Sequence, residues 1–433
     1  MKQEFIYLII YVIVILCISF YISKKSSSND FLIANRDRGF WSILFSKYAG
    51  SMGAGWFITY TAFAYEFGFG MFGMLIGFVL GYVLFAYLGS TKLYDLAHKN
   101  KLYTINQLVY FKTKSNLAKI ITSIYSNLVQ FLWLIISLVG GAKLFEHFNF
   151  FTYTQSLFIL LIIVGIYLIL SGFKGVIITD IIQSFIILGL LIVISYGIFS
   201  NVNSFNFMMV ETKPLSIVNT VGLFLYGLLS FFAYADRYQL LFSAKSKKDF
   251  MNGMSFAVVP LLITATMLIV IGLYVFSLNP NLDPAIVFLY SLENYLSSSI
   301  LSLGVIFFLA GIMSSIDTYV FTIATHSMFS FDKKNNPVFK LKIRMIITLF
   351  LALVVAYFSR DIIDLTVFGA AFSMSFAVPM LYLFFGKGKK FLNLVYGGFI
   401  GFVLGIIFLG INPIIMFTAL IGNGVGALIR VKK

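Results

Sequence analysis

The chain has 433 residues, of which 60% are hydrophobic and only 11% are charged, and its mean hydropathy is +0.97. Soluble domains carry about 25% charged residues, so this composition excludes a soluble globular enzyme and predicts an integral membrane protein. A transmembrane helix needs about 20 residues, so the chain holds about a dozen spans and leaves almost nothing for an extramembrane domain.

Thirteen apolar runs follow one another along the chain and are numbered 0 to 12. They cover residues 4–23, 40–65, 68–90, 117–146, 152–171, 175–200, 215–242, 250–277, 298–330, 338–358, 360–385, 390–409 and 412–429. No small-residue cleavage site follows run 0, so we expect a retained helix and not a signal peptide. Residues 102–112 form a short amphipathic stretch that should lie along the membrane surface. The pattern predicts an all-α membrane protein with 13 transmembrane helices.

The basic residues are distributed unequally between the two sets of connections. The connections after runs 0, 2, 4, 6, 8 and 10, with the C-terminus, hold 25 Lys and Arg residues, whereas the opposite side holds three, Lys2, Lys213 and Arg360. Cytoplasmic loops carry the excess of Lys and Arg. We therefore expect a protein of the cell (inner or plasma) membrane with its N-terminus outside and its C-terminus in the cytoplasm. The net charge of +15 then needs no nucleic-acid partner.

Run 1 carries three glycines, Gly50, Gly53 and Gly55, within six residues. Each weakens a helix by about 1 kcal/mol relative to alanine. Inside a membrane, freed carbonyls are tolerated only where they line a cavity or meet a ligand, so a glycine-interrupted span indicates a transporter site. The alternative is close helix packing through a surface of small residues. Run 1 alone does not decide between the two.

Acidic residues occur near the cytoplasmic ends of runs 5 and 6. Asp180 in run 5 belongs either to a polar site or to a hydrogen-bonded structural position. Asp236 and Arg237 lie near the cytoplasmic boundary of run 6, where we expect interface anchors and a salt bridge in the loop.

Polar residues gather on one face of run 8. Gly311, Ser314, Ser315 and Thr318 follow the i, i+3, i+4, i+7 spacing of one helical face, and Asp317 lies at its edge. A carboxylate in the hydrocarbon region costs at least ~2.5 kcal/mol, so Asp317 should face a cavity or a partner. Hydroxyl, carboxylate and carbonyl oxygens are ligands for a hard cation. The pattern favours the cation end of a transport site over the alternative, a polar seam between two helices.

Three motifs together resemble the sodium:solute symporter family. They are the spacing Gly, seven residues, Asp, two residues, Gln in Gly172–Gln183, the run Ala310–Thr318, and the Ala-Lys-Ser at residues 244–246. The resemblance covers essentially the whole chain and implies a LeuT-type fold with two inverted repeats of five helices. Residues 40–200 would form the first repeat and residues 215–385 the second. One extra helix at 4–23 and two at 390–433 would complete a single domain of residues 1–433.

The resemblance also implies a main sodium site between runs 1 and 8. It would use the backbone carbonyls of Gly50, Gly53 and Gly311 and the hydroxyls of Ser314 and Ser315. Five oxygens with little formal charge suit a weakly held, exchangeable Na⁺.

Some members of the family have a second sodium site nearer the cytoplasm. By position it would take Asp180 with Ser314, Asp317 and Thr318. Asp317 stands where several members have a hydroxyl, which leaves the number of Na⁺ ions per cycle, and the choice between Na⁺ and H⁺, open. Lys47 also departs from the family pattern. It either snorkels to the cytoplasmic interface or forms an ion pair with Asp180 or Asp317 that partly fills this second cation site.

The solute site cannot be transferred in this way, because the family's solutes include sugars, amino acids, vitamins and organic acids. By position, side chains from runs 1, 2, 3, 6 and 10 should line a cavity between the repeats. The candidates are Trp56, Phe72, Gln130, Tyr226 and Phe372. Aromatic residues make up 18% of the chain, so packing is an alternative explanation for each aromatic candidate.

The sequence therefore predicts a Na⁺-coupled symporter that imports a small polar solute (amino acid, organic acid, sugar or vitamin) by alternating access. Its expected partners are the solute, Na⁺ and the lipid bilayer, with no obligatory protein partner. A transporter-like membrane receptor and a proton-coupled symporter are the alternatives. A channel would need rings of charge or carbonyls along a continuous pore, whereas these polar residues lie on single helices. Three His residues and one Cys leave little for an enzyme, so no catalysis is expected.

Overall fold

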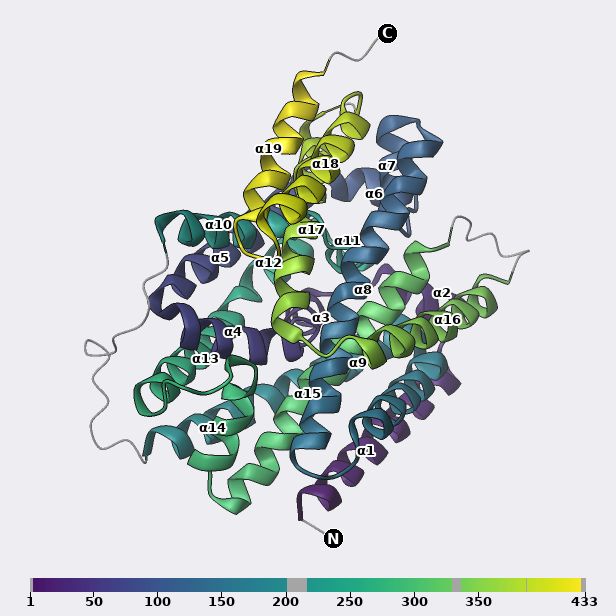
Figure 1. The fold of residues 1–433 in the computed structure, drawn as a ribbon. Helices are drawn as coiled ribbons and strands as arrows, with labels where there is room; N and C mark the ends of the chain where they lie inside the picture. Colours follow the sequence, from purple (N-terminus) through teal and green to yellow (C-terminus); the bar gives the residue numbers. More distant parts are fainter. Residues whose placement is uncertain (1–2, 201–215, 329–335, 387, 430–433) are drawn as a thin grey trace.

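The computed structural model describes residues 3–200, 216–328, 336–386 and 388–429, which form a bundle of helices (Figure 1). The α-helices are α1 (Gln3–Lys25), α2 (Ser28–Ile33), α3 (Phe40–Ala49), α4 (Ala54–Phe67), α5 (Met71–Leu88), α6 (Tyr94–Lys99), α7 (Ile105–Thr113), α8 (Asn116–His147), α9 (Tyr153–Ser200), α10 (Ile217–Leu229), α11 (Ala235–Ser243), α12 (Lys247–Phe256), α13 (Val258–Leu278), α14 (Val287–Tyr295), α15 (Ser298–His326), α16 (Pro337–Phe358), α17 (Ile362–Phe385), α18 (Phe391–Leu409) and α19 (Ile415–Leu428).

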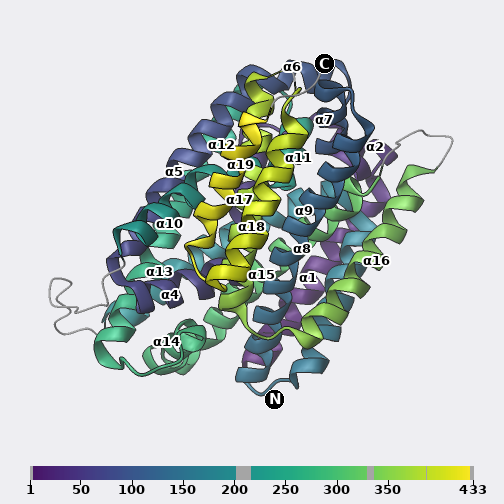
Figure 2. The same cartoon turned by 45° about the horizontal axis from the view of Figure 1, so that its top comes forward.

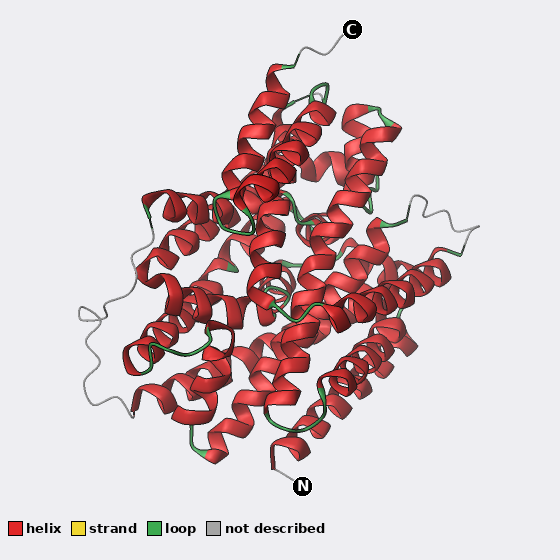
Figure 3. Cartoon of the chain, in the orientation of Figure 1, coloured by secondary structure: helices red, strands yellow, loops and turns green. Residues whose placement is uncertain are grey.

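Short irregular helices connect some of these elements. They are the 3-10 helices η1 (Ala34–Arg36), η2 (Gly68–Gly70), η5 (Ser230–Phe232) and η6 (Pro284–Ile286), and the π-helix η3 (Gly89–Leu93). Over the described ranges no strand forms, as Figure 3 shows, and an isolated bridge joins Arg38 to Ala244. The amphipathic stretch expected at residues 102–112 appears as α7.

Membrane-spanning helices account for most of the fold, because a helix satisfies every backbone N–H and C=O within one segment, as the hydrocarbon core demands. Among the described residues, nine helical segments are long and apolar enough to cross a membrane, or ten if the bent pair of α10 and α11 forms one span. Two of these segments each cover parts of two predicted runs: Ala54–Lys99 covers the second part of run 1 and all of run 2, and Tyr153–Gly197 covers most of runs 4 and 5. The all-α membrane class is confirmed, while the count of 13 spans and the two-repeat division stay predictions.

Three interruptions in the helices position the site. A stretch of non-helical backbone from Gly50 to Gly53 separates α3 from α4. The α10 and α11 segments meet at a 42° bend around η5. The long α9 is kinked at Gly172, whose φ of 58° is the left-handed conformation that glycine adopts without strain. A side chain at Gly172 would also strike the ring of Phe31, with its Cβ 2.5 Å from that ring.

The interior of the bundle is formed by α8, α15 and α17, in each of which 78% of the most apolar window is buried. The corresponding windows of α1, α16 and α18 are only 28%, 33% and 33% buried, so these helices lie at the periphery. Figures 1 and 2 both show α8 and α15 between α4 and the peripheral helix α1. The polar face predicted on run 8 is thus on one of the most buried helices, α15.

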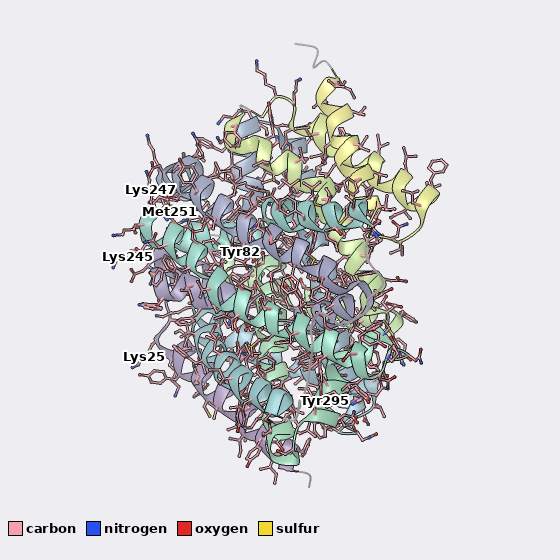
Figure 4. The ribbon with its side chains drawn as sticks, turned by 90° about the vertical axis from the view of Figure 1, so that its left-hand side faces the viewer. Lys25, Tyr82, Lys245, Lys247, Met251 and Tyr295 are labelled. Atoms are coloured by element: carbon pink, nitrogen blue, oxygen red, sulfur yellow. The ribbon has the colours of Figure 1, made fainter. Side chains whose placement is uncertain are left out.

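Basic side chains cluster at one edge of the molecule. Figure 4 shows Lys25, Lys245 and Lys247 at the same edge, and Tyr295 of α14 away from them. This arrangement agrees with a charge asymmetry between two faces, while the orientation of the termini stays a prediction. Some residues used to predict the orientation lie outside the described ranges, namely Lys2, Lys213, Lys333, Lys334, Lys387, Arg430, Lys432 and Lys433.

Candidate functional site

The break between α3 and α4 lies at the glycines singled out in the sequence. Regular helix ends at Ala49, and Met52 N–H donates to the Ala49 carbonyl over 2.8 Å in a tight turn. Gly53 is extended, with φ −83° and ψ −177°, and α4 begins directly after it. The predicted interruption is therefore confirmed over residues 50–53, whereas Gly55 lies inside α4.

Glycine is needed at this break because α15 comes very close to it. A Cβ added at Gly311 of α15 would lie 2.0 Å from the carbonyl oxygen of Met52. A Cβ added at Gly53 would lie 2.6 Å from Oγ of Ser315 and 2.9 Å from Oγ of Ser137 on α8. Both explanations of the glycines, a helix break and close packing, thus hold at the same place.

The candidate main sodium site lies in this contact. Oγ of Ser315 donates a hydrogen bond of 3.2 Å to the carbonyl oxygen of Gly50, and Gly53 and Gly311 lie against the same interface. The Gly53 carbonyl, in contrast, already accepts hydrogen bonds from the backbone N–H groups of Trp56 and Phe57. The carbonyl of Met52, which sequence reasoning missed, faces the interface and is an additional candidate ligand.

Ser314, the fifth predicted member of the main sodium site, points toward α9 instead. Its hydroxyl donates to Oδ1 of Asp180, while the hydroxyl of Ser46 on α3 donates to Oδ2 of the same carboxylate. Asp180 of α9 is fully buried, and these two hydrogen bonds connect it to α3 and to α15. This arrangement has features of both predicted alternatives, a polar site and a hydrogen-bonded structural position.

Asp317 forms the other half of the candidate second cation site. Its Oδ2 accepts a hydrogen bond of 2.8 Å from the hydroxyl of Tyr167 on α9. Its Oδ1 is buried and makes no hydrogen bond of normal geometry. Thr318 lies beside the break, since its Oγ1 would be 3.1 Å from a Cβ at Gly50. The orphaned carboxylate oxygen fits a site that a cation completes, because buried polar atoms without a partner are costly.

Lys47 does not form the predicted ion pair with Asp180 or Asp317, and this prediction is corrected by the structure. Its Nζ lies 2.6 Å from Oδ2 of Asp236, and only 4% of Lys47 and 7% of Asp236 are exposed. The reason is the bend between α10 and α11, which places Asp236 in the first turn of α11, facing the last turn of α3. A carboxylate at a helix N-terminus and an ammonium at a helix C-terminus each complement the helix dipole.

The prediction that Asp236 and Arg237 anchor the membrane interface is also wrong. Both side chains are buried, and Oδ1 of Asp236 accepts a hydrogen bond of 2.9 Å from Nε2 of Gln130 on α8. The guanidinium of Arg237 lies over the rings of Phe231 and Tyr234, 3.7 Å and 4.2 Å from their centroids. An Asp-Arg pair within an apolar run signals a functional site in a membrane, and that signal was available in the sequence.

A cavity with about 670 Å³ of space, including its mouth, lies next to this charged group. Its walls come from the spans around both breaks and from α5, α8, α15, α17 and α19. The lining residues include Lys47, Ser51, Trp56, Thr59, Tyr60, Phe78, Trp133, Tyr226, Tyr234, Asp236, Arg237, Tyr319 and Thr366.

The predicted solute residues divide into two groups. Trp56 and Tyr226 line the cavity, and Gln130 reaches it through its hydrogen bond to Asp236. Phe72 and Phe372 are not among the described residues that line it. The ring of Phe372 stacks on Tyr125 with centroids 4.9 Å apart, so it belongs to the packing between α8 and α17. The sequence placed Phe72 and Phe372 on apolar helices, but it did not show which side of each helix faces the cavity.

Known proteins resemble this chain in both sequence and structure. The sodium/pantothenate symporter of Haemophilus influenzae is 28% identical over 182 residues, an alignment that spans 41% of this chain and 37% of that protein. The structure of a Na⁺-coupled sialic acid symporter, in a substrate-bound outward-open state, superposes with a TM-score of 0.75 at 15% identity, over 99% of this chain and 98% of that one.

A nucleobase-cation-symport-1 family transporter in a closed conformation superposes with a TM-score of 0.58 at 14% identity, over 92% of this chain and 94% of that one. These superpositions place the chain in the LeuT-like transporter fold. The model of the sodium:solute symporter family matches residues 31–405, which agrees with Na⁺ as the expected coupling ion. By that match the chain belongs to the sodium:solute symporter family.

Proposed function

We propose that the protein is a secondary transporter that couples inward Na⁺ flow to the import of a small polar solute by alternating access. The observation that carries this proposal is the contact of the broken α3–α4 span with α15, where the Gly50 carbonyl and the Ser315 hydroxyl already face each other. A polar contact between a broken span and a buried helix, beside a cavity, is the arrangement that transporter sites use.

Na⁺ would bind by replacing a hydrogen bond with coordination. In the structure the hydroxyl of Ser315 donates to the Gly50 carbonyl over 3.2 Å. When both oxygens turn their lone pairs to one cation, with the nearby Met52 carbonyl, the cation holds α3–α4 against α15. The lining of the cavity includes Trp56 of α4, so ordering this span by Na⁺ also orders the solute site. Reciprocity requires the solute to tighten Na⁺ binding by the same factor.

A second cation site is proposed at Asp180, Asp317 and Thr318. Lys47 is paired with Asp236 and forms no salt bridge with either of these carboxylates. A second Na⁺ or a proton would then neutralise Asp317, whose Oδ1 is buried without a hydrogen bond of normal geometry. Na⁺ is favoured because hydroxyls of Ser314 and Ser46 surround Asp180 with further hard oxygens. Protonation of Asp317 is the alternative, and it would make the second coupling ion H⁺.

The solute is proposed to be small and partly apolar, since aromatic rings and a few polar groups line the cavity. Pantothenate and sialic acid, the solutes named for the two similar symporters, are therefore the first candidates to test. The protein is proposed to work in the cell membrane, with its basic face toward the cytoplasm.

Purified protein in proteoliposomes tests the proposal. Imposed Na⁺ gradients should drive accumulation of a radiolabelled candidate solute, and K⁺ gradients of the same size should not. Solute-dependent counterflow without a gradient would separate a transporter from a receptor, which binds but does not move its ligand. Accumulation driven by a pH gradient in the absence of Na⁺ would support proton coupling and contradict the proposal.

A further inference from the structure

Arg237 is a cation in the cavity wall that has no carboxylate partner among the described residues. It is only 6% exposed, and none of the salt bridges between described residues involves it. Its Nη1 makes one long hydrogen bond, 3.4 Å, to the Ser230 carbonyl, and its Nε has no acceptor. A guanidinium has five N–H donors. Most of its hydrogen-bonding capacity is therefore unused.

Asp236, the neighbouring carboxylate, forms no salt bridge with Arg237. Its Oδ2 lies 2.6 Å from Nζ of Lys47, and its Oδ1 accepts a hydrogen bond of 2.9 Å from Gln130. Lys47 and Asp236 cancel each other, and Arg237 leaves the cavity with one net positive charge. A buried charge is stable only when it is paired and hydrogen-bonded. The missing partner of this cavity is thus a single negative charge.

The packing of Arg237 selects the shape of that partner. The rings of Phe231 and Tyr234 lie against the guanidinium, with centroids 3.7 Å and 4.2 Å away. Neither ring offers a carboxylate or carbonyl acceptor, so these contacts do not use the N–H groups of the guanidinium in ion pairs. Its planar fork of N–H groups matches the two oxygens of a carboxylate.

The rest of the cavity suits an organic body with a few polar groups. The rings of Trp56 and Tyr60 stack with centroids 4.5 Å apart and form part of the wall. Tyr60 is only 2% exposed, yet its buried hydroxyl has no hydrogen-bond partner. The hydroxyls of Tyr226 and Tyr234 lie 3.1 Å apart in the same wall. An unpaired buried hydroxyl on a residue that lines a cavity is a second, independent sign of a ligand.

We propose that the transported solute is a small monocarboxylate, whose carboxylate binds the edge of Arg237 while its body lies against the Trp56–Tyr60 wall. This inference rests on the proposed symport function and names its substrate class. A neutral sugar would leave Arg237 unpaired, and a dicarboxylate would bring one charge too many. An amino acid would bring an ammonium group to a cavity whose one carboxylate is already paired with Lys47.

Thermal unfolding of the purified protein in Na⁺ and in K⁺ tests the inference with pairs of probes that differ only at the acid. The pairs are pantothenate with its alcohol pantothenol, sialic acid with its methyl ester, and lactate with lactamide; glucose and proline represent neutral sugars and amino acids. Binding to the folded state raises the unfolding temperature by mass action. At least one acid should raise it in Na⁺, and its uncharged counterpart should not at the same concentration.

Variants then assign the effect to Arg237. Arg237→Gln should abolish the shift caused by the acid, and Arg237→Lys, which keeps the charge but not the fork, should weaken acid binding at least about 10-fold. Arg360→Gln is the matched control, because Arg360 is exposed and stacks on Tyr153 away from the cavity. It should bind the acid as the wild type does. If Arg237→Gln fails to fold, the Arg237→Lys variant and the probe pairs on the wild-type protein still test whether the acid binds at Arg237.

The outcomes separate this inference from the proposed function. Equal shifts by an acid and its uncharged counterpart, or shifts by glucose or proline alone, overturn the monocarboxylate inference and leave Na⁺ symport in place. If Na⁺ raises the unfolding temperature more than K⁺ does, but none of the acids raises it further, the monocarboxylate inference is also overturned and Na⁺ symport stays in place. No difference between Na⁺ and K⁺ under any condition counts against the symport function itself.

Discussion

Lys47 and Asp236 join the two interrupted spans of the molecule, with Nζ and Oδ2 only 2.6 Å apart. Lys47 lies in the last turn before the break of the α3–α4 span, and Asp236 lies in the first turn after the bend of the α10–α11 pair. Both also line the cavity. The ion pair therefore fixes the spacing of the two segments between which the solute is proposed to bind.

Removal of Lys47 should destabilise the protein by stranding the carboxylate of Asp236. Breaking one partner of a buried pair typically costs about 3–5 kcal/mol. Lys47→Met should lower the unfolding temperature and abolish solute uptake, and the double variant Lys47→Met with Asp236→Asn should recover part of the lost stability. A double variant no more stable than Lys47→Met alone would contradict the pairing.

The matched control for this experiment is an exposed ion pair. Lys245 and Asp37 lie 3.7 Å apart, and their side chains are 66% and 63% exposed. Pairs of this kind contribute about 0–1 kcal/mol. Lys245→Met should therefore leave the unfolding temperature almost unchanged.

The hydroxyl of Ser315 should contribute to Na⁺ affinity. Ser315→Ala removes one oxygen from the proposed main sodium site, so the Na⁺ concentration for half-maximal solute uptake should rise several-fold at unchanged protein abundance. Ser291→Ala is the control, since Ser291 of α14 is buried and bonds only its own helix, through the Phe288 carbonyl. Identical Na⁺ dependence in both variants would remove Ser315 from the site.

Close approach of α15 to the helix break should make Gly311 sensitive to a single methyl group. Gly311→Ala would place Cβ 2.0 Å from the Met52 carbonyl oxygen, so backbone must move, which typically costs about 1–3 kcal/mol. Gly189→Ala in α9 is the control, because nothing lies within 4 Å of the added atom. It should be neutral or stabilising by about 0.5–1 kcal/mol. Thermal unfolding of both variants checks this, and equal stabilities would contradict the packing.

Asp317 should determine the number of coupling ions. Asp317→Asn removes the charge of the proposed second cation site, so the ratio of Na⁺ to solute in paired flux measurements should fall by one ion. Tyr167→Phe removes the hydrogen bonds from its hydroxyl to Oδ2 of Asp317 and to the Met313 carbonyl but leaves the carboxylate charge, so it should keep the ratio. An unchanged ratio in Asp317→Asn would show that no Na⁺ binds there. A pH-dependent uptake that disappears in this variant would assign the position to a proton.

Sequence reasoning located the polar helix and the break, because both carry local signals. The three glycines can be read within run 1, and the spacing from Gly311 to Thr318 can be read within run 8. In the structure, Gly50 of the first segment and Ser315 of the second form a hydrogen bond. Such signals state which residues are unusual for a lipid environment. They do not state which partner each residue meets on another helix.

The pairing of Lys47 could not be predicted for this reason. Its partner Asp236 is 189 residues away, and only the bend between α10 and α11 turns that carboxylate toward α3. The direction of Phe372 was missed in the same way, since it lies on α17, a largely buried helix whose inward side includes both packing and cavity. Rotation of a helix about its axis is set by tertiary packing, which the apolar pattern of a fully buried helix leaves undetermined.

Binding of ²²Na⁺ to the purified protein tests the central claim most directly, because it requires no knowledge of the solute. The account predicts saturable binding that unlabelled Na⁺ displaces and K⁺ does not, with clearly weaker affinity in Ser315→Ala and unchanged affinity in Ser291→Ala. Absence of saturable binding, or the same affinity in wild type and Ser315→Ala, would contradict a sodium site between Gly50 and Ser315.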